Sequence, residues 1–136
     1  MKKSWGLIPK ILSGEKTIES RWYQTKRAPW GRIRRGDTIY FKNAGEPVVA
    51  KATITGVLQF EIGSADEASK IVRTHGKRIC LINDDPHTWE KTPNYCILAF
   101  LERPEEVPKP FHIRKSGFGA AAAWLTVEDI AAIKVV

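Results

Sequence analysis

Hydrophobic residues recur at helical spacing in the opening segment of the chain. The apolar positions there are Leu7, Ile8, Ile11 and Leu12. Their spacing of three to four residues places them on one face of a helix. Proline is tolerated in the first turn of a helix, so Pro9 predicts a start near Leu7, with Ser4 as a candidate N-cap. Ser13 and Gly14 follow the last apolar position and are expected to end the helix.

Strand-like patterns fill most of the remaining chain. Alternating, β-branched or continuously apolar runs cover residues 17–21, 38–42, 48–62 and 95–101. The run 48–62 is expected to bend near Gly56 and to pair with 38–42 as a hairpin. The run 95–101 is continuously apolar, which predicts a strand buried on both faces. Shorter strands are expected over 111–114 and 132–136.

One further helix is expected over residues 65–75. Ser64 is its candidate N-cap, the first turn is acidic as the helix dipole favours, and Gly76 is the expected end. Residues 78–82 fit either a strand or a helix. The proline-rich residues 104–110 are expected to form an extended connector, and Thr126 to open a capped helical turn.

These elements predict a fold that is mainly β with short helices. The strands are not separated by regular crossover helices, which disfavours a parallel doubly wound sheet. We expect a small, mostly antiparallel barrel that its last strand closes. The 136 residues are the size of one domain, and 43% of them are hydrophobic, so a single domain over 1–136 is expected.

Composition excludes several classes of protein. No apolar run is long enough to cross a bilayer and no signal peptide is recognisable, so the sequence is interpreted as a soluble, cytoplasmic protein with no membrane partner. Cys80 and Cys96 are too few for a disulfide framework and are expected to be buried. The three histidines are scattered, so neither a metal site nor a cofactor is expected.

Basic residues are concentrated in the first third of the chain. The whole chain carries a net charge of +7. Residues 1–42 hold eleven Lys or Arg and three Asp or Glu, whereas residues 43–136 hold eleven Lys or Arg and twelve Asp or Glu. Such asymmetry favours a surface that meets an anion, and nucleic acid is the commonest large one. A basic surface that only maintains solubility is the alternative.

Three charged residues around the second element are candidates for chemistry. Lys16 lies at the turn before strand 17–21, and period-two alternation turns Glu19 and Arg21 to the same face. Glu19 would accept hydrogen bonds from base amino groups or sugar hydroxyls, Arg21 would supply a planar donor fork, and Lys16 a point charge for phosphate. An ion pair that serves only the fold explains the same spacing equally well.

Gly14, Lys16, Glu19 and Arg21 make up the pattern G-x-K-x-x-E-x-R, which resembles the signature of the ASCH family. Residues 35–41 and 49–57 resemble the strands that follow it there, so the resemblance covers at least 7–60; residues 109–133 are more weakly similar to the closing part. ASCH domains belong to the PUA-like superfamily. The resemblance therefore implies a six-stranded antiparallel pseudobarrel.

The resemblance also implies functions. ASCH domains are regarded as RNA-binding or RNA-modification modules with a cleft beside the motif; one branch hydrolyses N4-acetylcytidine, and another has been described as ribonucleolytic. In the amidohydrolase branch a lysine that matches Lys16 is the base. Glu19 stands where that branch has a nucleophilic threonine, and a carboxylate cannot supply that hydroxyl nucleophile. Glu19 would instead act as a general base towards water.

Aromatic residues flank the basic loop over residues 24–37. Such a composition is typical of a groove that stacks bases and follows a phosphate backbone. Lys115 and Ser116 resemble a loop near the cleft of related domains. The candidate binding residues are therefore Lys16, Glu19, Arg21, Trp22, Tyr23, Lys26, Arg27, Trp30, Arg34, Arg35, Lys115 and Ser116.

Three functions fit these observations. The first is an RNA-binding module that takes single-stranded RNA or one nucleotide, modified or not, in a basic cleft beside the motif, with DNA as the alternative polymer. The second is an enzyme, a nucleoside amidohydrolase or a ribonuclease, with Lys16 and Glu19 as catalytic residues. The third is a protein-interaction domain.

Overall fold

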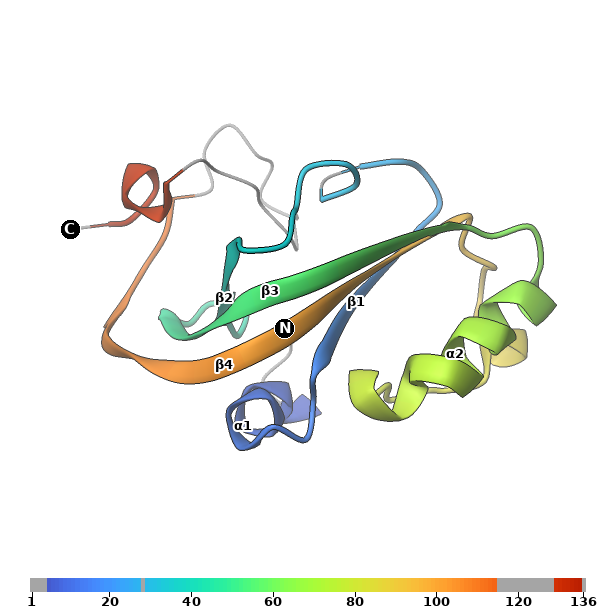
Figure 1. Ribbon diagram of the computed structural model, residues 1–136, viewed down its shortest axis with the longest axis horizontal. Helices are drawn as coiled ribbons and strands as arrows, with labels where there is room; N and C mark the ends of the chain where they lie inside the picture. The colour runs from blue at the N-terminus through green and yellow to red at the C-terminus, as the bar shows by residue number, and fades with distance from the viewer. Residues whose placement is uncertain (1–4, 28, 115–128, 136) are drawn as a thin grey trace.

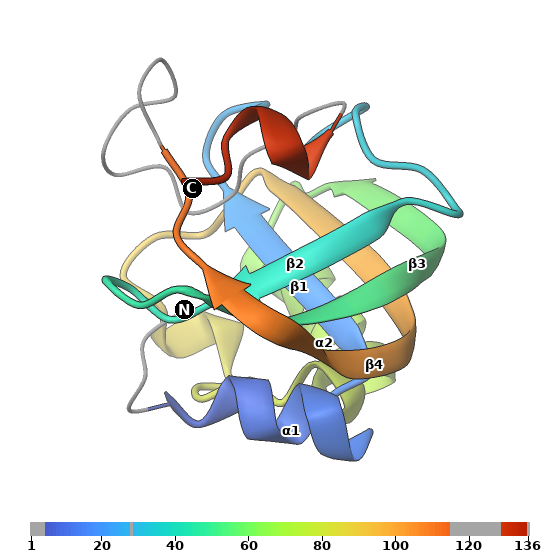
Figure 2. The ribbon, with the colours of Figure 1, turned by 90° about the vertical axis from the view of Figure 1, so that its left-hand side faces the viewer.

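Four antiparallel strands form one sheet in the order β1-β4-β3-β2. The computed structural model describes residues 5–27, 29–114 and 129–135. The strands are β1 (Ile18–Tyr23), β2 (Thr38–Lys42), β3 (Val48–Glu61) and β4 (Tyr95–Phe111), and the α-helices are α1 (Leu7–Ser13) and α2 (Ala65–Ile79). Figures 1 and 2 show a strongly twisted sheet with α1 below it and the β1–β2 loop above, and Figure 2 shows α2 behind the strands. An antiparallel, mainly β fold is confirmed, with four strands rather than six in the described residues.

Two hydrophobic clusters lie on opposite faces of the sheet. One joins α1 to β2, β3 and β4 and includes Ile11, Ile54 and Ala99. The other packs α2 against β1 and β4 and includes Ile18 and Leu98. Alternation along β4 divides its residues between the two clusters, which explains why its first half is buried on both faces, as the sequence predicts.

Local signals account for most of the element boundaries. Helix α1 begins at Leu7 and ends at Gly14, whose left-handed backbone suits glycine. Gly6 precedes the helix without a side-chain cap, and Ser4 lies outside the described residues. Ser64 caps α2 by accepting a hydrogen bond from the backbone nitrogen of Glu67. The β2–β3 hairpin is confirmed. The pairing of β3 with β4 shifts in register between Ile54 and Gly56 of β3.

Helix α2 does not end at Gly76, so this prediction is wrong. Gly76 is buried inside the helix, and a Cβ atom there would approach Cγ1 of Val72 to 3.1 Å. Close packing therefore explains the glycine. The helix continues to Ile79 and ends at Cys80, which has a left-handed φ of 59°. Cys80 is only half-buried, contrary to expectation, whereas Cys96 is buried.

Two predictions near the C-terminal end are also wrong. Residues 104–110 are not a connector but part of β4, which pairs there with β3 through Glu105 and Glu106. Strand β1 pairs with β4 only as far as Phe100, so the prolines lie where one side of β4 has no named partner strand, and an edge tolerates proline. In place of the strand expected over 132–136, the described residues form a short 3-10 helix, η3 (Ile130–Ala132), and one bridge from Ile113 to Lys134.

Candidate functional site

The sheet brings predicted site residues together on one face in three successive rows across β1, β4 and β3. The rows are Glu19, Ala99 and Val57; Arg21, Ile97 and Gln59; and Tyr23, Tyr95 and Glu61. Because side chains alternate along each strand, these rows share the face opposite α2. The polarity changes along the rows, from a buried carboxylate at Glu19 to an aromatic pair at Tyr23 and Tyr95. Glu19 and Arg21 therefore face the same way, as the sequence predicts.

Glu19 is a buried carboxylate, only 3% exposed. Its Oε1 atom accepts a hydrogen bond from the backbone nitrogen of Ser20 at 3.1 Å, and lies 3.6 Å from the guanidinium of Arg21 and 3.9 Å from Nζ of Lys16. Its Oε2 atom is buried and accepts no hydrogen bond from the residues that the structure describes. A buried carboxylate oxygen in this state is an acceptor suited to a ligand donor.

Lys16 is held between two backbone carbonyl groups. Its Nζ atom donates to the oxygen of Ile18 at 2.8 Å and to the oxygen of Ile79 at 2.5 Å, and the residue is 2% exposed. Its backbone nitrogen donates a hydrogen bond to the carbonyl oxygen of Lys10, and this bond fixes the turn from α1 into β1. Burial lowers the pKa of Lys16, and the neighbouring carboxylate of Glu19 opposes this effect.

Arg21 and Tyr23 lead from this buried pair towards solvent. The side chain of Arg21 is 23% exposed, and its NH1 atom lies 3.4 Å from the carbonyl oxygen of Ser20. Tyr23 is half-buried, and burial raises the pKa of its hydroxyl, against the effect of the cations of Arg21 and Arg27. The guanidinium of Arg27 lies 5.0 Å from the centre of the Tyr23 ring.

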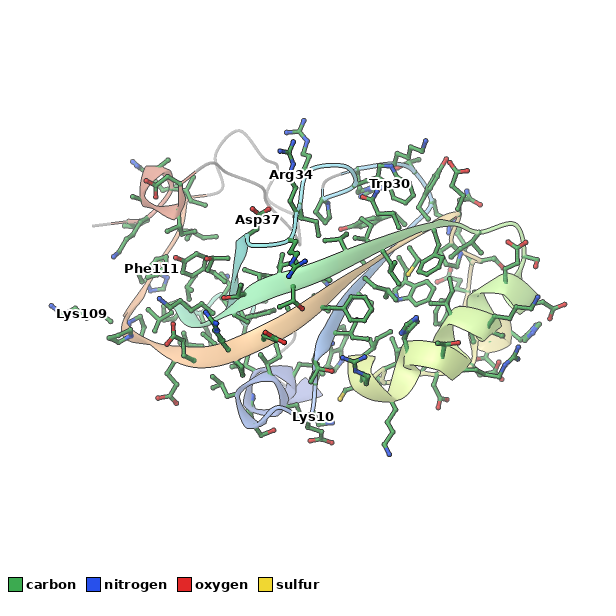
Figure 3. All side chains as sticks on the ribbon, in the orientation of Figure 1. Lys10, Trp30, Arg34, Asp37, Lys109 and Phe111 are labelled. Atoms are coloured by element: carbon green, nitrogen blue, oxygen red, sulfur yellow. The ribbon has the colours of Figure 1, made fainter. Side chains whose placement is uncertain are left out.

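The basic loop over residues 24–37 folds back over the same face. The backbone nitrogen of Gly31 donates to Oε1 of Gln59 at 2.6 Å, and the ring of Trp30 meets that of Tyr95 edge to face with centroids 5.2 Å apart. Lys26 lies over both rings and 3.4 Å from Glu61. Figure 3 shows Trp30 and Arg34 on the loop above the sheet. The exposed arginines of this loop are Arg27, Arg32, Arg34 and Arg35.

Two groups of predicted site residues are not brought to this face. Trp22 lies on the opposite face, where its ring packs edge to face on Trp89 at 5.0 Å and its Nε1 atom donates to Ser20. It also packs against the cluster beneath α2. Lys115 and Ser116 lie outside the described residues, as does Thr126.

Sequence reasoning missed three contributors to the site: Tyr95, Glu61 and Gln59. All three lie on β3 or β4, in the same rows as the predicted site residues Arg21 and Tyr23 of β1. Tyr95 opens an apolar run, so its pattern indicates burial rather than a site. Only the register of the sheet, which the sequence does not encode locally, places these residues beside the loop.

A groove lies between the two helices. This groove of about 360 Å³ is lined by Lys10, Glu15, Lys77, Cys80 and Ile82 among others. Its lining carries charges of both signs, and none of the side chains of Lys16, Glu19 and Arg21 lines it.

In the described residues no three His, Cys, Asp or Glu side chains gather as a metal site. No described helix is long and apolar enough to span a membrane.

Comparison with solved structures finds similar folds in the ASCH protein of Zymomonas mobilis. The alignment with that protein has a TM-score of 0.60 at 15% identity and covers 82% of this chain and 69% of the other. One mutant form gives a TM-score of 0.60 at 15% identity over 82% of this chain and 71% of the other. A second mutant form gives 0.59 at 13% identity over 82% of this chain and 70% of the other. The chain has the fold of an ASCH protein. No protein-family model and no curated protein matches the sequence.

Proposed function

We propose that the protein is an RNA-binding module of the ASCH, PUA-like type that takes single-stranded RNA, or one nucleotide of it, beside Glu19 and Arg21. The observation that carries this proposal is the position of the basic, aromatic loop 24–37 over the face that holds both residues. Arginines attract phosphates, and exposed rings stack on unpaired bases. The acceptor on Glu19 and the donors on Arg21 then supply polar contacts to a base or sugar.

The charge distribution supports a polyanionic ligand. Five of the eleven Lys and Arg residues among positions 1–42 belong to the loop that lies over the site, against one acidic residue, Asp37. A ligand that displaces counterions from this loop binds more weakly as salt rises, and the slope reports the number of phosphates contacted. Single strands are favoured because a base must leave its partner to reach the aromatic pair.

The test is a titration of a labelled single-stranded RNA against two charge-matched triple variants. In the first, Arg32, Arg34 and Arg35 become Gln; in the second, the exposed cations Lys70, Arg73 and Lys77 of α2 become Gln. We expect the loop variant to lose at least about tenfold in affinity and the helix variant to lose far less. Equal losses of RNA affinity in the two variants would mean that RNA is attracted only by the net charge, and would refute binding at this face. A DNA oligonucleotide and an RNA duplex of the same sequence show which polymer is preferred.

Catalysis is the second candidate, and one observation favours it. Burial lowers the pKa of Lys16, and its Nζ atom lies 3.9 Å from a carboxylate with one open acceptor atom among the described residues. A lysine of this kind is a candidate base towards a nucleoside amide. Its two hydrogen bonds to backbone carbonyls oppose that role. Formation of cytidine from N4-acetylcytidine, or cleavage of RNA, lost in Glu19→Gln, would establish it.

A further inference from the structure

The rings of Trp30 and Tyr95 form a corner that already holds a cation. The two ring planes meet at 72°, with centroids 5.2 Å apart. Nζ of Lys26 lies 5.6 Å from the first centroid and 5.7 Å from the second, and 3.4 Å from Oε1 of Glu61. One ammonium group thus faces two aromatic rings and a carboxylate. Proteins use this combination to hold external cations.

Resting on the proposed function, we infer that this corner binds a positively charged nucleobase, one methylated on a ring nitrogen, and that Lys26 occupies the corner when no ligand is present. The nucleobase would stack on the ring of Trp30 or Tyr95 and place its charge near Glu61. The phosphate of the same nucleotide would meet the arginines of the loop. The ammonium group of Lys26 then competes with the ligand for the corner and does not contact the phosphate.

Lys26 is placed to be displaced. Its side chain is 53% exposed and that of Glu61 is 70% exposed, and an ion pair so open to water contributes little to stability. Lys26 also belongs to the loop and not to a strand, so its side chain can leave the corner without a change in the sheet. Tyr95 and Glu61 face each other across β4 and β3 and remain in place.

The surroundings favour a nucleotide over a methylated lysine of a protein. Arg27 lies over Tyr23, the next ring of the same row, and the remaining arginines of the loop are exposed. A cation alone would be repelled by this charge. A nucleotide with a cationic base carries both signs, so it offers a negative group to the arginines and a positive, planar group to the corner. An uncharged base lacks the electrostatic attraction to the rings and to Glu61 that a cationic base would gain in the corner.

Two isomeric probes separate charge from size. The monophosphates of N1-methyladenosine and N6-methyladenosine have the same heavy atoms, but at neutral pH only the first has a cationic base. Calorimetric titration of the wild-type protein is expected to give about tenfold tighter binding of the N1-methyl isomer. Trp30→Leu is expected to abolish this preference, and Glu61→Gln to reduce it. Equal affinities of the wild-type protein for the two isomers would overturn the inference.

The variant Lys26→Gln shows whether Lys26 competes with the ligand for the corner or binds the phosphate of the ligand. We expect this change to raise affinity for the N1-methyl isomer several-fold, because the corner is vacated. Lys109→Gln is the control, since it removes another exposed cation, at the far end of β4 (Figure 3). Weaker binding of both isomers by Lys26→Gln would overturn the inference. So would tighter binding of a trimethyllysine peptide than of the nucleotide. Salt-dependent RNA binding with no isomer preference would refute the corner and leave the proposed function standing.

Discussion

Nζ of Lys16 donates a hydrogen bond of 2.5 Å to the carbonyl oxygen of Ile79, which lies in the last turn of α2. The same atom donates to the oxygen of Ile18 and lies 3.9 Å from Glu19. Lys16 therefore joins the end of a helix, the start of β1 and the candidate binding carboxylate. A cation at the C-terminus of a helix also meets the negative end of the helix dipole. The lysine of the motif thus has a structural role in addition to any contact with a ligand.

Replacement of this lysine is expected to destabilise the fold. Lys16→Met keeps most of the side-chain volume but removes the charge; it leaves two carbonyl groups without their donor and takes away the cation 3.9 Å from Glu19. Breaking a buried pair in this way costs roughly 3–5 kcal/mol of the free energy of unfolding. Urea denaturation followed by circular dichroism measures the loss. Lys77→Met, an exposed lysine of α2, is the control and is expected to change stability by less than about 0.5 kcal/mol. Equal effects of the two substitutions would contradict the structural role.

Stability is expected to depend on pH through the same group. Burial holds the pKa of Lys16 below its ordinary value of 10.5 in the folded chain. Between the lowered pKa and 10.5 the unfolded chain binds more protons than the folded one, so the contribution of Lys16 to the free energy of unfolding increases as pH rises through this window. The difference between wild type and Lys16→Met should therefore grow from neutral pH towards 10.5. A difference that shrinks with pH would show that the sign is wrong.

The end of α2 stores strain that a glycine relieves. Cys80 has a φ of 59° and a ψ of 49°, a left-handed conformation that disfavours side chains with a Cβ atom. Cys80→Gly is expected to be more stable than Cys80→Ala by about 1 kcal/mol, because both lose the thiol but only glycine relaxes the backbone. Thermal unfolding of the two variants measures this difference. An alanine variant as stable as the glycine variant would contradict it.

The sequence predicts elements where local signals dominate. The helix that ends at Gly14, the cap at Ser64 and the buried run of β4 each follow from a few neighbouring residues. Prediction failed at Gly76 because that glycine is buried inside the helix and packs closely on Val72, one turn earlier in α2, so it does not mark a helix end. It failed over residues 104–110 because prolines that normally interrupt a strand are tolerated along an edge.

The candidate site is predicted in part for the same reason. Alternation alone turns Glu19 and Arg21 to one face, and the aromatic and basic loop is visible in the composition. The carbonyl partner of Lys16 at Ile79 lies 63 residues away, and the aromatic partner of Trp30 at Tyr95 is equally remote. Contacts of this kind depend on strand register and helix packing, which no local pattern specifies.

The proposed function predicts that RNA binds at the face beside Glu19 and Arg21. A fluorescence titration of a short, mixed-sequence single-stranded RNA against wild type and Arg21→Gln at two salt concentrations, with the tryptophans as reporters, tests this binding. We expect salt-sensitive quenching in the wild type, and affinity about tenfold lower in Arg21→Gln because the loss of one charged donor costs ~1–3 kcal/mol. Identical titrations of the two proteins, or no quenching at low salt, would contradict the claim.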